Sequence, residues 1–243
     1  MRISCIRQRI STMHFHTSFV ILPHMKKLEG VISNLEGTLI NNRPLIIASF
    51  RYTFETHGMA QPRRGEILNT IGLPLTTSFQ LLTKTSSFPN TDRMVATYLR
   101  FKRDNPQLAR WYPDAKRSLE WMQENGIPIS LVVTQSKVMT ENLMEHFAIT
   151  KFFHNVITRD QVKNQKPHPE GLLRAIRSMG VPARHVIMFG HSANDIYAGK
   201  DAGCRETIAI AHEAPDWKIL QARPSKIIRQ NWNLVPIMKK ILK

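Results

Sequence analysis

Two polar side chains, Asn34 and Glu36, stand at the end of a short apolar segment near the start of the chain. Residues 29–35 are mostly apolar and β-prone, and Gly37 and Thr38 then break the pattern, so a buried strand is expected to end here. Open α/β sheets bind their ligands at the carboxyl ends of their strands. Asn34 and Glu36 are therefore candidates for a ligand-binding or catalytic site.

Three later segments repeat this combination of a predicted element and polar residues beside it. The polar residues are Thr134 and Gln135 at the end of the apolar run 127–134, Lys166 before a proline that opens a predicted helix, and His191, Ser192 and Asp195 after the apolar run 185–190. Taken alone, each segment is an ordinary turn or loop. The order in which the four segments follow one another along the chain is a more specific signal than any one segment.

In that order, the four segments resemble the four sequence motifs of the haloacid dehalogenase (HAD) superfamily. The segments Gly72–Leu75 and Trp111–Ala115 resemble its phosphoglycolate phosphatase-like branch. The resemblance spans residues 31–203 and thus most of the chain. It implies an α/β fold with a Rossmann-like parallel sheet core and an inserted all-helical cap.

The pattern of elements predicts the same organisation. We expect a basic tail or targeting segment over residues 1–24, a core formed by 25–42 and 111–243, and a helical cap over 43–110. The cap region predicts helices over 44–58, 62–70, 75–83 and 92–103. Beyond residue 111, helices and strands alternate, which is typical of a parallel sheet covered on both faces.

The resemblance also implies a mechanism. An acidic residue of the first motif attacks phosphorus and forms an aspartyl-phosphate, and the acid two residues later acts as general acid and base. A Mg²⁺ ion held by the first and fourth motifs screens the negative charges. By this correspondence Asn34 occupies the nucleophile position and Glu36 the acid–base position. Phosphate binding is assigned to Thr134, Gln135 and Lys166, and metal binding to Asp195, Asn34 and His191.

Asn34 and His191 depart from the family pattern, which has an aspartate at each position. A carboxamide is a poor nucleophile and a weak Mg²⁺ ligand, and removing a covalent nucleophile commonly costs about 10⁴–10⁶ in turnover. Imidazole replaces a hard oxygen ligand, which disfavours Mg²⁺. Glu36 keeps a carboxyl group, one methylene further out. We therefore expect a catalytically impaired relative of phosphoglycolate-type phosphatases.

The replaced residues remove about as much negative charge as the Mg²⁺ ion would have neutralised. Glu36, Asp195 and Lys166 remain, so the pocket is expected to persist without metal and to bind phosphate or a small phosphorylated molecule. Two alternatives stay open. The chain is an active phosphatase of a small phosphorylated metabolite, with Glu36 or a water that it activates replacing the nucleophile, or it is a basic module that binds nucleic acid or acidic proteins.

The balance of charge has two interpretations: attraction to an anionic partner such as nucleic acid or an acidic protein, or a solvated basic surface without a dedicated partner, which we favour slightly. The 243 residues include 34 Lys and Arg against 18 Asp and Glu, a net charge of +16. The basic residues are dispersed, with short clusters over 100–103 and 239–243 that are candidate surface patches. No apolar run approaches the ~18 residues that cross a bilayer, so no membrane partner is expected. Cys5 and Cys204 have no metal or redox spacing, which favours a reducing compartment.

Residues 1–28 carry several basic residues, and Glu29 is the first acidic one. Such a composition resembles a mitochondrial presequence. The alternative, which we favour, places the functional start near Met25 and treats the preceding residues as a misplaced start or a disordered tail. A cytoplasmic location is then expected, with a mitochondrial location as the alternative.

Overall fold

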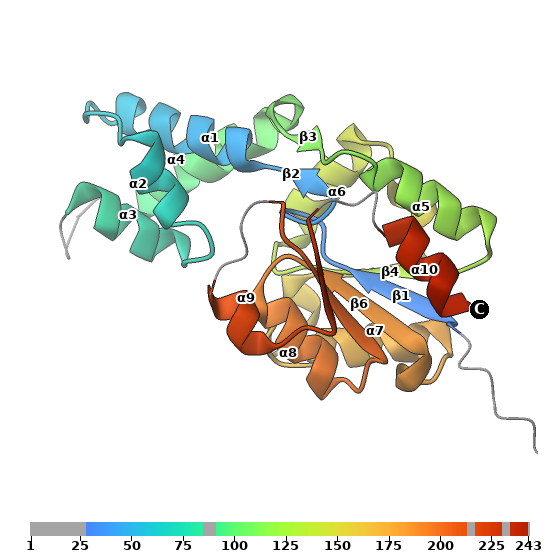
Figure 1. Cartoon of the computed structure of the whole chain (residues 1–243). Coiled ribbons are helices and arrows are strands. Elements are labelled where there is room, and N and C mark those ends of the chain that lie inside the picture. The colour runs from blue at the N-terminus through green and yellow to red at the C-terminus, as the bar shows by residue number, and fades with distance from the viewer. Residues whose placement is uncertain (1–27, 85–90, 213–216, 230–233, 243) are drawn as a thin grey trace, which may run out of the picture.

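The computed structural model describes residues 28–84, 91–212, 217–229 and 234–242 (Figure 1). At its centre lies a six-stranded sheet with the order β5-β4-β1-β6-β7-β8, in which each adjacent pair is parallel. The strands are β1 (Gly30–Ser33), β4 (Ile129–Val132), β5 (Asn155–Ile157), β6 (Val186–Gly190), β7 (Glu206–Ile210) and β8 (Lys226–Ile228). The expected tail, residues 1–24, lies outside the described residues.

Helices cover both faces of this sheet, as the alternation along the chain predicts. One face packs against α5 (Ala115–Glu124), α6 (Lys137–His146) and α10 (Leu234–Leu242). The other face packs against α7 (Glu170–Met179) and α8 (Ala193–Asp201), and α9 (Trp217–Ala222) lies beside α8.

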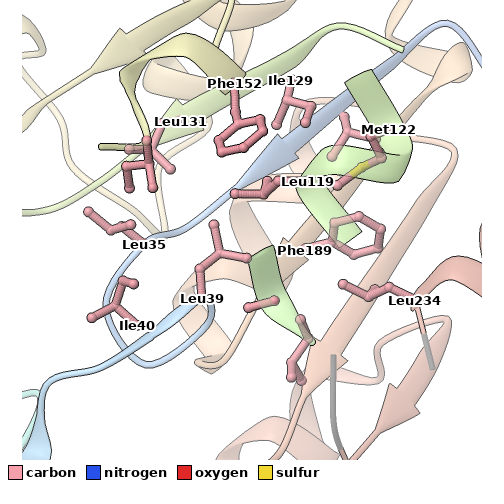
Figure 2. Packing of buried hydrophobic residues seen from close by; sticks show 14 of the residues in the cluster. Leu35, Leu39, Ile40, Leu119, Met122, Ile129, Leu131, Phe152, Phe189 and Leu234 are labelled. Atoms are coloured by element: carbon pink, nitrogen blue, oxygen red, sulfur yellow. The ribbon is translucent and has the colours of Figure 1, made fainter. Parts of the chain in front are cut away.

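The central strand β1 is buried on both sides, and its alternate side chains enter two separate hydrophobic clusters. Val31 packs with residues of α5, whereas Ile32 packs with residues of α7 and α8. Leu35 and Leu39, in the loop after β1, continue the first cluster, as Figure 2 shows. The loop that carries Asn34 is therefore anchored by buried neighbours.

Four helices form a separate bundle above the sheet (Figure 1): α1 (Arg43–Thr56), α2 (Arg64–Asn69), α3 (Leu75–Thr83) and α4 (Thr91–Asp104). Their own hydrophobic cluster includes three aromatic residues in contact. The ring centroid of Phe50 lies 5.1 Å from that of Phe79 and 4.8 Å from that of Tyr98. A helical cap needs such an independent core. The boundaries at residues 43 and 110 remain a prediction.

A short antiparallel pair joins the bundle to the core. It is formed by β2 (Ile40–Asn41) and β3 (Arg110–Trp111), with Ile40 opposite Trp111. Neither strand was predicted, because two residues show no periodicity. The short elements β8 and α9, of 3 and 6 residues, were not predicted for the same reason.

The predicted fold class, α/β with a Rossmann-like parallel sheet and an inserted helical cap, is confirmed. The segment ends differ by a few residues, and the run 127–134, for example, forms a strand only over Ile129–Val132. Within the described ranges, every helix is too short or too polar to cross a bilayer.

Candidate active site

The carboxyl ends of β1, β4 and β6 lie next to one another, because β1 pairs with both neighbours. Asn34 directly follows β1 and donates its backbone N–H to the carbonyl of Phe189 in β6 at 3.0 Å. Gln135 follows β4, and His191 is the first residue after β6. The sheet thus gathers residues as much as 157 positions apart at one edge.

Lys166 connects these residues. Its ammonium group donates to Asn34 Oδ1 at 3.3 Å, to the carbonyl of Val132 at 2.8 Å and to Asp195 Oδ1 at 2.5 Å. These three contacts use all three N–H donors of a lysine. The side chains of Lys166 and Asp195 are only 4% and 1% exposed, so they form a buried ion pair whose partners depend on each other.

The partners of Asn34 determine which way its amide points. The ammonium of Lys166 can only donate, so it contacts the amide oxygen, and the carbonyl of Glu36 can only accept, so it contacts the amide nitrogen. Nδ2 lies 2.9 Å from this carbonyl and 3.1 Å from Nδ1 of His191. His191 Nδ1 therefore accepts a hydrogen bond, which places the proton of the neutral ring on Nε2.

Asp195 accepts hydrogen bonds at both carboxylate oxygens. Oδ2 lies 3.1 Å from the backbone nitrogens of His191 and Ser192 and 2.8 Å from the Ser192 hydroxyl, in a capping box at the start of α8. Burial by itself would raise the pKa of Asp195, but Lys166 and these hydrogen bonds outweigh it and hold the pKa below its ordinary value. Asp195 is therefore ionised at neutral pH.

His191 is the most exposed of the residues that contact Asn34, with 37% of its side chain accessible. Burial of the remainder lowers the pKa of His191, and repulsion from Lys166 and Arg43 acts in the same direction. Asp195, 3.8 Å from Nδ1, opposes this shift without reversing it. The ring is therefore neutral at pH 7.

Glu36 contacts a different set of residues. Its Oε1 lies 2.8 Å from Nζ of Lys102, which belongs to the last turn of α4, and the two side chains are 13% and 4% exposed. Burial by itself would raise the pKa of Glu36, but Lys102 and hydrogen bonds from Asn42 and Gln135 hold it below its ordinary value. Burial, together with the Glu36 charge, raises the pKa of Tyr98, so its hydroxyl stays protonated.

This set of donors and acceptors does not fit Mg²⁺, which prefers several free oxygen ligands in an octahedral array. Asn34 directs its amide N–H groups at the Glu36 carbonyl, where a cation would need a lone pair. Both oxygens of Asp195 already accept hydrogen bonds. No cluster of three or more His, Cys, Asp or Glu able to hold a metal ion occurs in the part of the chain that the structure describes.

Most residues that the sequence singled out meet at this edge, namely Asn34, Glu36, Gln135, Lys166, His191 and Asp195. Thr134 reaches the same edge by its position after β4 and is exposed, and its hydroxyl has no partner among the described residues. The structure therefore brings the residues together, while their roles remain a proposal.

Two contributors, Asn42 and Lys102, were not predicted. The basic cluster over 100–103 was interpreted as a surface patch, but Lys102 is buried. The available signal was its spacing, because Met94, Tyr98 and Lys102 recur every four residues on the buried face of α4.

Comparison with known proteins identifies the family. Residues 31–209 match the haloacid dehalogenase-like hydrolase family, and the chain belongs to it. The HAD placement predicted from the sequence is thereby confirmed.

Among its relatives, the chain is 30% identical over 214 residues to pyrophosphatase PpaX of Halalkalibacterium halodurans, covering 87% of this chain and 97% of that protein. It is also 30% identical over 213 residues to pyrophosphatase PpaX of Oceanobacillus iheyensis, with the same coverage of 87% and 97%. The chain is thus a HAD-like hydrolase that resembles phosphatases.

Solved structures of the same fold include a predicted phosphoglycolate phosphatase from Haemophilus somnus, with a TM-score of 0.77 and 19% identity over 89% of this chain and 100% of that one. A haloacid dehalogenase-like hydrolase from Streptococcus pneumoniae has a TM-score of 0.74 and 19% identity, covering 87% and 98%. At these identities the likeness establishes the fold alone.

Proposed function

We propose that this chain binds phosphate or a small phosphorylated molecule without a metal ion and forms no covalent phosphoryl intermediate. The observation that carries the proposal is the amide of Asn34, held between Lys166 and the carbonyl of Glu36. The amide nitrogen is a poor nucleophile, and the amide oxygen already accepts a hydrogen bond. The side chain in the nucleophile position is thus engaged as a structural bridge.

Several donors are available to an anion at this edge. The backbone N–H groups of Leu35 and Glu36 have no acceptor within the described ranges. The Thr134 hydroxyl is exposed and without a described partner, and Lys166 supplies a positive charge nearby. Successive backbone N–H groups beside a hydroxyl form the kind of concavity that binds phosphate, and Lys166, whose own N–H donors are all engaged, contributes only its charge.

The charges at this edge are already balanced. Asp195 is paired with Lys166, and Glu36 is paired with Lys102. Each carboxylate near the site therefore has its own ammonium partner, which does part of the screening that a divalent cation supplies in the family. This pairing supports a pocket that is stable without metal.

Equilibrium dialysis of the whole chain against inorganic phosphate tests the binding. We expect equal affinity in EDTA and in Mg²⁺, and a loss of about tenfold in Thr134→Val, because a hydrogen bond to a charged group is removed. Absence of phosphate binding, or tight Mg²⁺ binding by the unaltered chain, would contradict the proposal.

Hydrolysis of an aryl phosphate tests the catalytic part. The double replacement Asn34→Asp, His191→Asp restores both family acids, and we expect it to bind Mg²⁺ and to gain Mg²⁺-dependent turnover. The matched control, Asn34→Ala, His191→Ala, should gain none. A phosphorylated residue trapped in the unaltered chain would overturn this part.

The second candidate is an active phosphatase, and the ionised state of Glu36 favours it. A carboxylate held by Lys102 beside the phosphate-binding edge is able to activate water. Two relatives are named pyrophosphatases, which agrees with such an activity. Mg²⁺-dependent turnover of pyrophosphate or an aryl phosphate by the unaltered chain, abolished in both Asn34→Ala and Glu36→Ala, would favour this candidate over the first.

A further inference from the structure

The helix α9 and the strand β8, at the outer end of the sheet, carry large apolar side chains on the molecular surface. Trp217 is 64% exposed, Leu220 53% and Ile227 38%. Trp217 and Leu220 are three residues apart, so they lie on the same side of α9. The helix is held onto the core by its other side, through Ile219 and Ala222. Exposed apolar side chains that gather in one place mark interaction sites.

The register of the sheet places Ile227 on the side that α9 covers. Ile227 is paired with Ala209 of β7, and residues paired in neighbouring strands direct their side chains to the same face of the sheet. Ala209 packs in one cluster with Ile219 and Ala222 of α9. Ile227 therefore lies on the face of the sheet where α9 lies, on the outermost strand.

The charged side chains of this unit are all of one sign. Residues 217–229 include four basic side chains and no Asp or Glu. Lys226 pairs with Glu206 of β7 at 3.4 Å. Arg223 and Arg229 are exposed, and neither forms an ion pair with another described residue. Two arginines are therefore available to an acidic partner.

These arginines lie at opposite ends of the unit. Because β7 and β8 are parallel, α9, which lies between them in the chain, runs in the opposite direction and begins at the edge where the strands end. Trp217 is the first residue of α9, and Arg229 directly follows β8, so both lie at this edge. Arg223 directly follows α9 and lies at the other edge, before β8 begins. The apolar side chains thus have a guanidinium group at each end.

This combination fits a protein partner that has acidic and apolar side chains. Trp and Arg are enriched where protein interfaces are most strongly bound, whereas Asp and Glu are depleted there. Nucleic acid binds mainly through its phosphates, which would leave Leu220 and Ile227 unused, and Trp217 offers one stacking position. A second copy of this chain would bring the same arginines together across a two-fold axis. The charge and the apolar surface therefore favour an acidic protein.

We propose that the surface formed by α9 and β8 docks a protein segment that carries both acidic and apolar side chains. The surface consists of Trp217, Leu220, Arg223, Ile227 and Arg229. The apolar side chains of the partner pack between the two arginines, and its carboxylates pair with them. β8 lies three strands from β1, roughly 14 Å across the sheet, so the inference is independent of the function proposed for the candidate active site.

Fluorescence anisotropy of labelled probes, titrated with the whole chain, tests the surface. The first probe is a peptide in which glutamate alternates with leucine and phenylalanine. The second has serine at the apolar positions, and the third is a single-stranded oligodeoxynucleotide. Two double variants alter the surface, namely Trp217→Ala, Leu220→Ser and Arg223→Gln, Arg229→Gln.

Each double variant has a matched control elsewhere on the molecule. Val138→Ser, Leu81→Ser replaces two comparably exposed apolar residues of α6 and α3. Arg93→Gln, Arg100→Gln removes two exposed arginines of α4. The controls change hydrophobicity and net charge as the surface variants do, so they separate a local effect from a general one.

We expect the first peptide to bind the unaltered chain at least tenfold more tightly than the serine peptide or the oligonucleotide. Each surface variant should lose tenfold or more in this affinity, while both controls keep it. Equal losses in the controls would show unspecific attraction and overturn the proposal. So would the absence of peptide binding, or unchanged affinity in the surface variants. An oligonucleotide that binds as tightly as the first peptide, and is lost in the same variants, would assign the surface to nucleic acid instead.

Discussion

Lys102 and Glu36 form a buried ion pair, 2.8 Å long, between the helical cap and the sheet core. Glu36 belongs to the loop after β1, whereas Lys102 ends the buried face of α4. The candidate acid–base residue is thus held by the cap as well as by the core. A change in the position of α4 would alter both the charge around Glu36 and its orientation.

The first prediction concerns this pair. Lys102→Met removes the ammonium and leaves the Glu36 carboxylate buried without its partner, so we expect a loss of about 3 kcal/mol in the free energy of unfolding. Urea denaturation measures this loss. The control is Arg103→Met on the same helix, whose pair with Asp104 is about half exposed, 50% and 51%, so that solvent screens it and its loss should change the stability far less. Equal effects of the two variants would contradict the prediction.

The second prediction concerns the other buried pair. Lys166→Met leaves the ionised Asp195, which is 1% exposed, buried without its partner. We therefore expect a loss of about 3–5 kcal/mol in the free energy of unfolding. Adding Asp195→Asn removes this unpaired buried charge, so the double variant Lys166→Met, Asp195→Asn should be more stable than Lys166→Met alone. Urea unfolding of both variants checks this order. A double variant less stable than the single one would show that charge compensation is not what Lys166 supplies.

The third prediction follows from the lowered pKa of Asp195. A carboxyl whose pKa is lower in the folded than in the unfolded chain stabilises the fold above the unfolded value, near 3.8, and this contribution disappears as the pH falls through the folded value. We therefore expect the unaltered chain to lose stability below about pH 4 more steeply than Asp195→Asn. The control is Asp201→Asn, at an exposed position. If the stability of the unaltered chain, Asp195→Asn and Asp201→Asn changed with pH in the same way, the lowered pKa of Asp195 would be wrong.

The sequence was sufficient to predict which residues lie at the carboxyl edge of the sheet. It was not sufficient to predict the contacts that these residues make with one another. Asn34, Thr134 and His191 were recognised because each follows a predicted strand, and parallel strands end at one edge. The direction of the Asn34 amide depends on partners 132 and 157 positions away, which no local pattern reveals. Lys102 was missed because its charge suggests a surface position, whereas burial beside Glu36 depends on how the cap sits on the core.

The fourth prediction concerns Cys204, which packs against the cluster formed by α7 and α8. Burial raises the pKa of its thiol from 9.0 to about 12. Because the thiolate is the reactive form, alkylation at pH 8 should be roughly a thousandfold slower than for an unperturbed thiol. Peptide mapping after iodoacetamide treatment, in native buffer and in urea, measures this. Rapid labelling of Cys204 in the native protein would contradict the burial.

The last prediction compares one substitution at two glycines. A Cβ at Gly190 would collide with the side chain of Asp195, so Gly190→Ala must displace Asp195 from the capping box and from Lys166. We expect a loss of more than about 2 kcal/mol in the free energy of unfolding. Gly65 lies in α2 with no atom within 4 Å of its added Cβ, so Gly65→Ala should gain about 0.5–1 kcal/mol from helix propensity. Thermal and urea unfolding of the two variants should therefore shift in opposite directions. A neutral Gly190→Ala would mean that Asp195 is not confined as the structure places it.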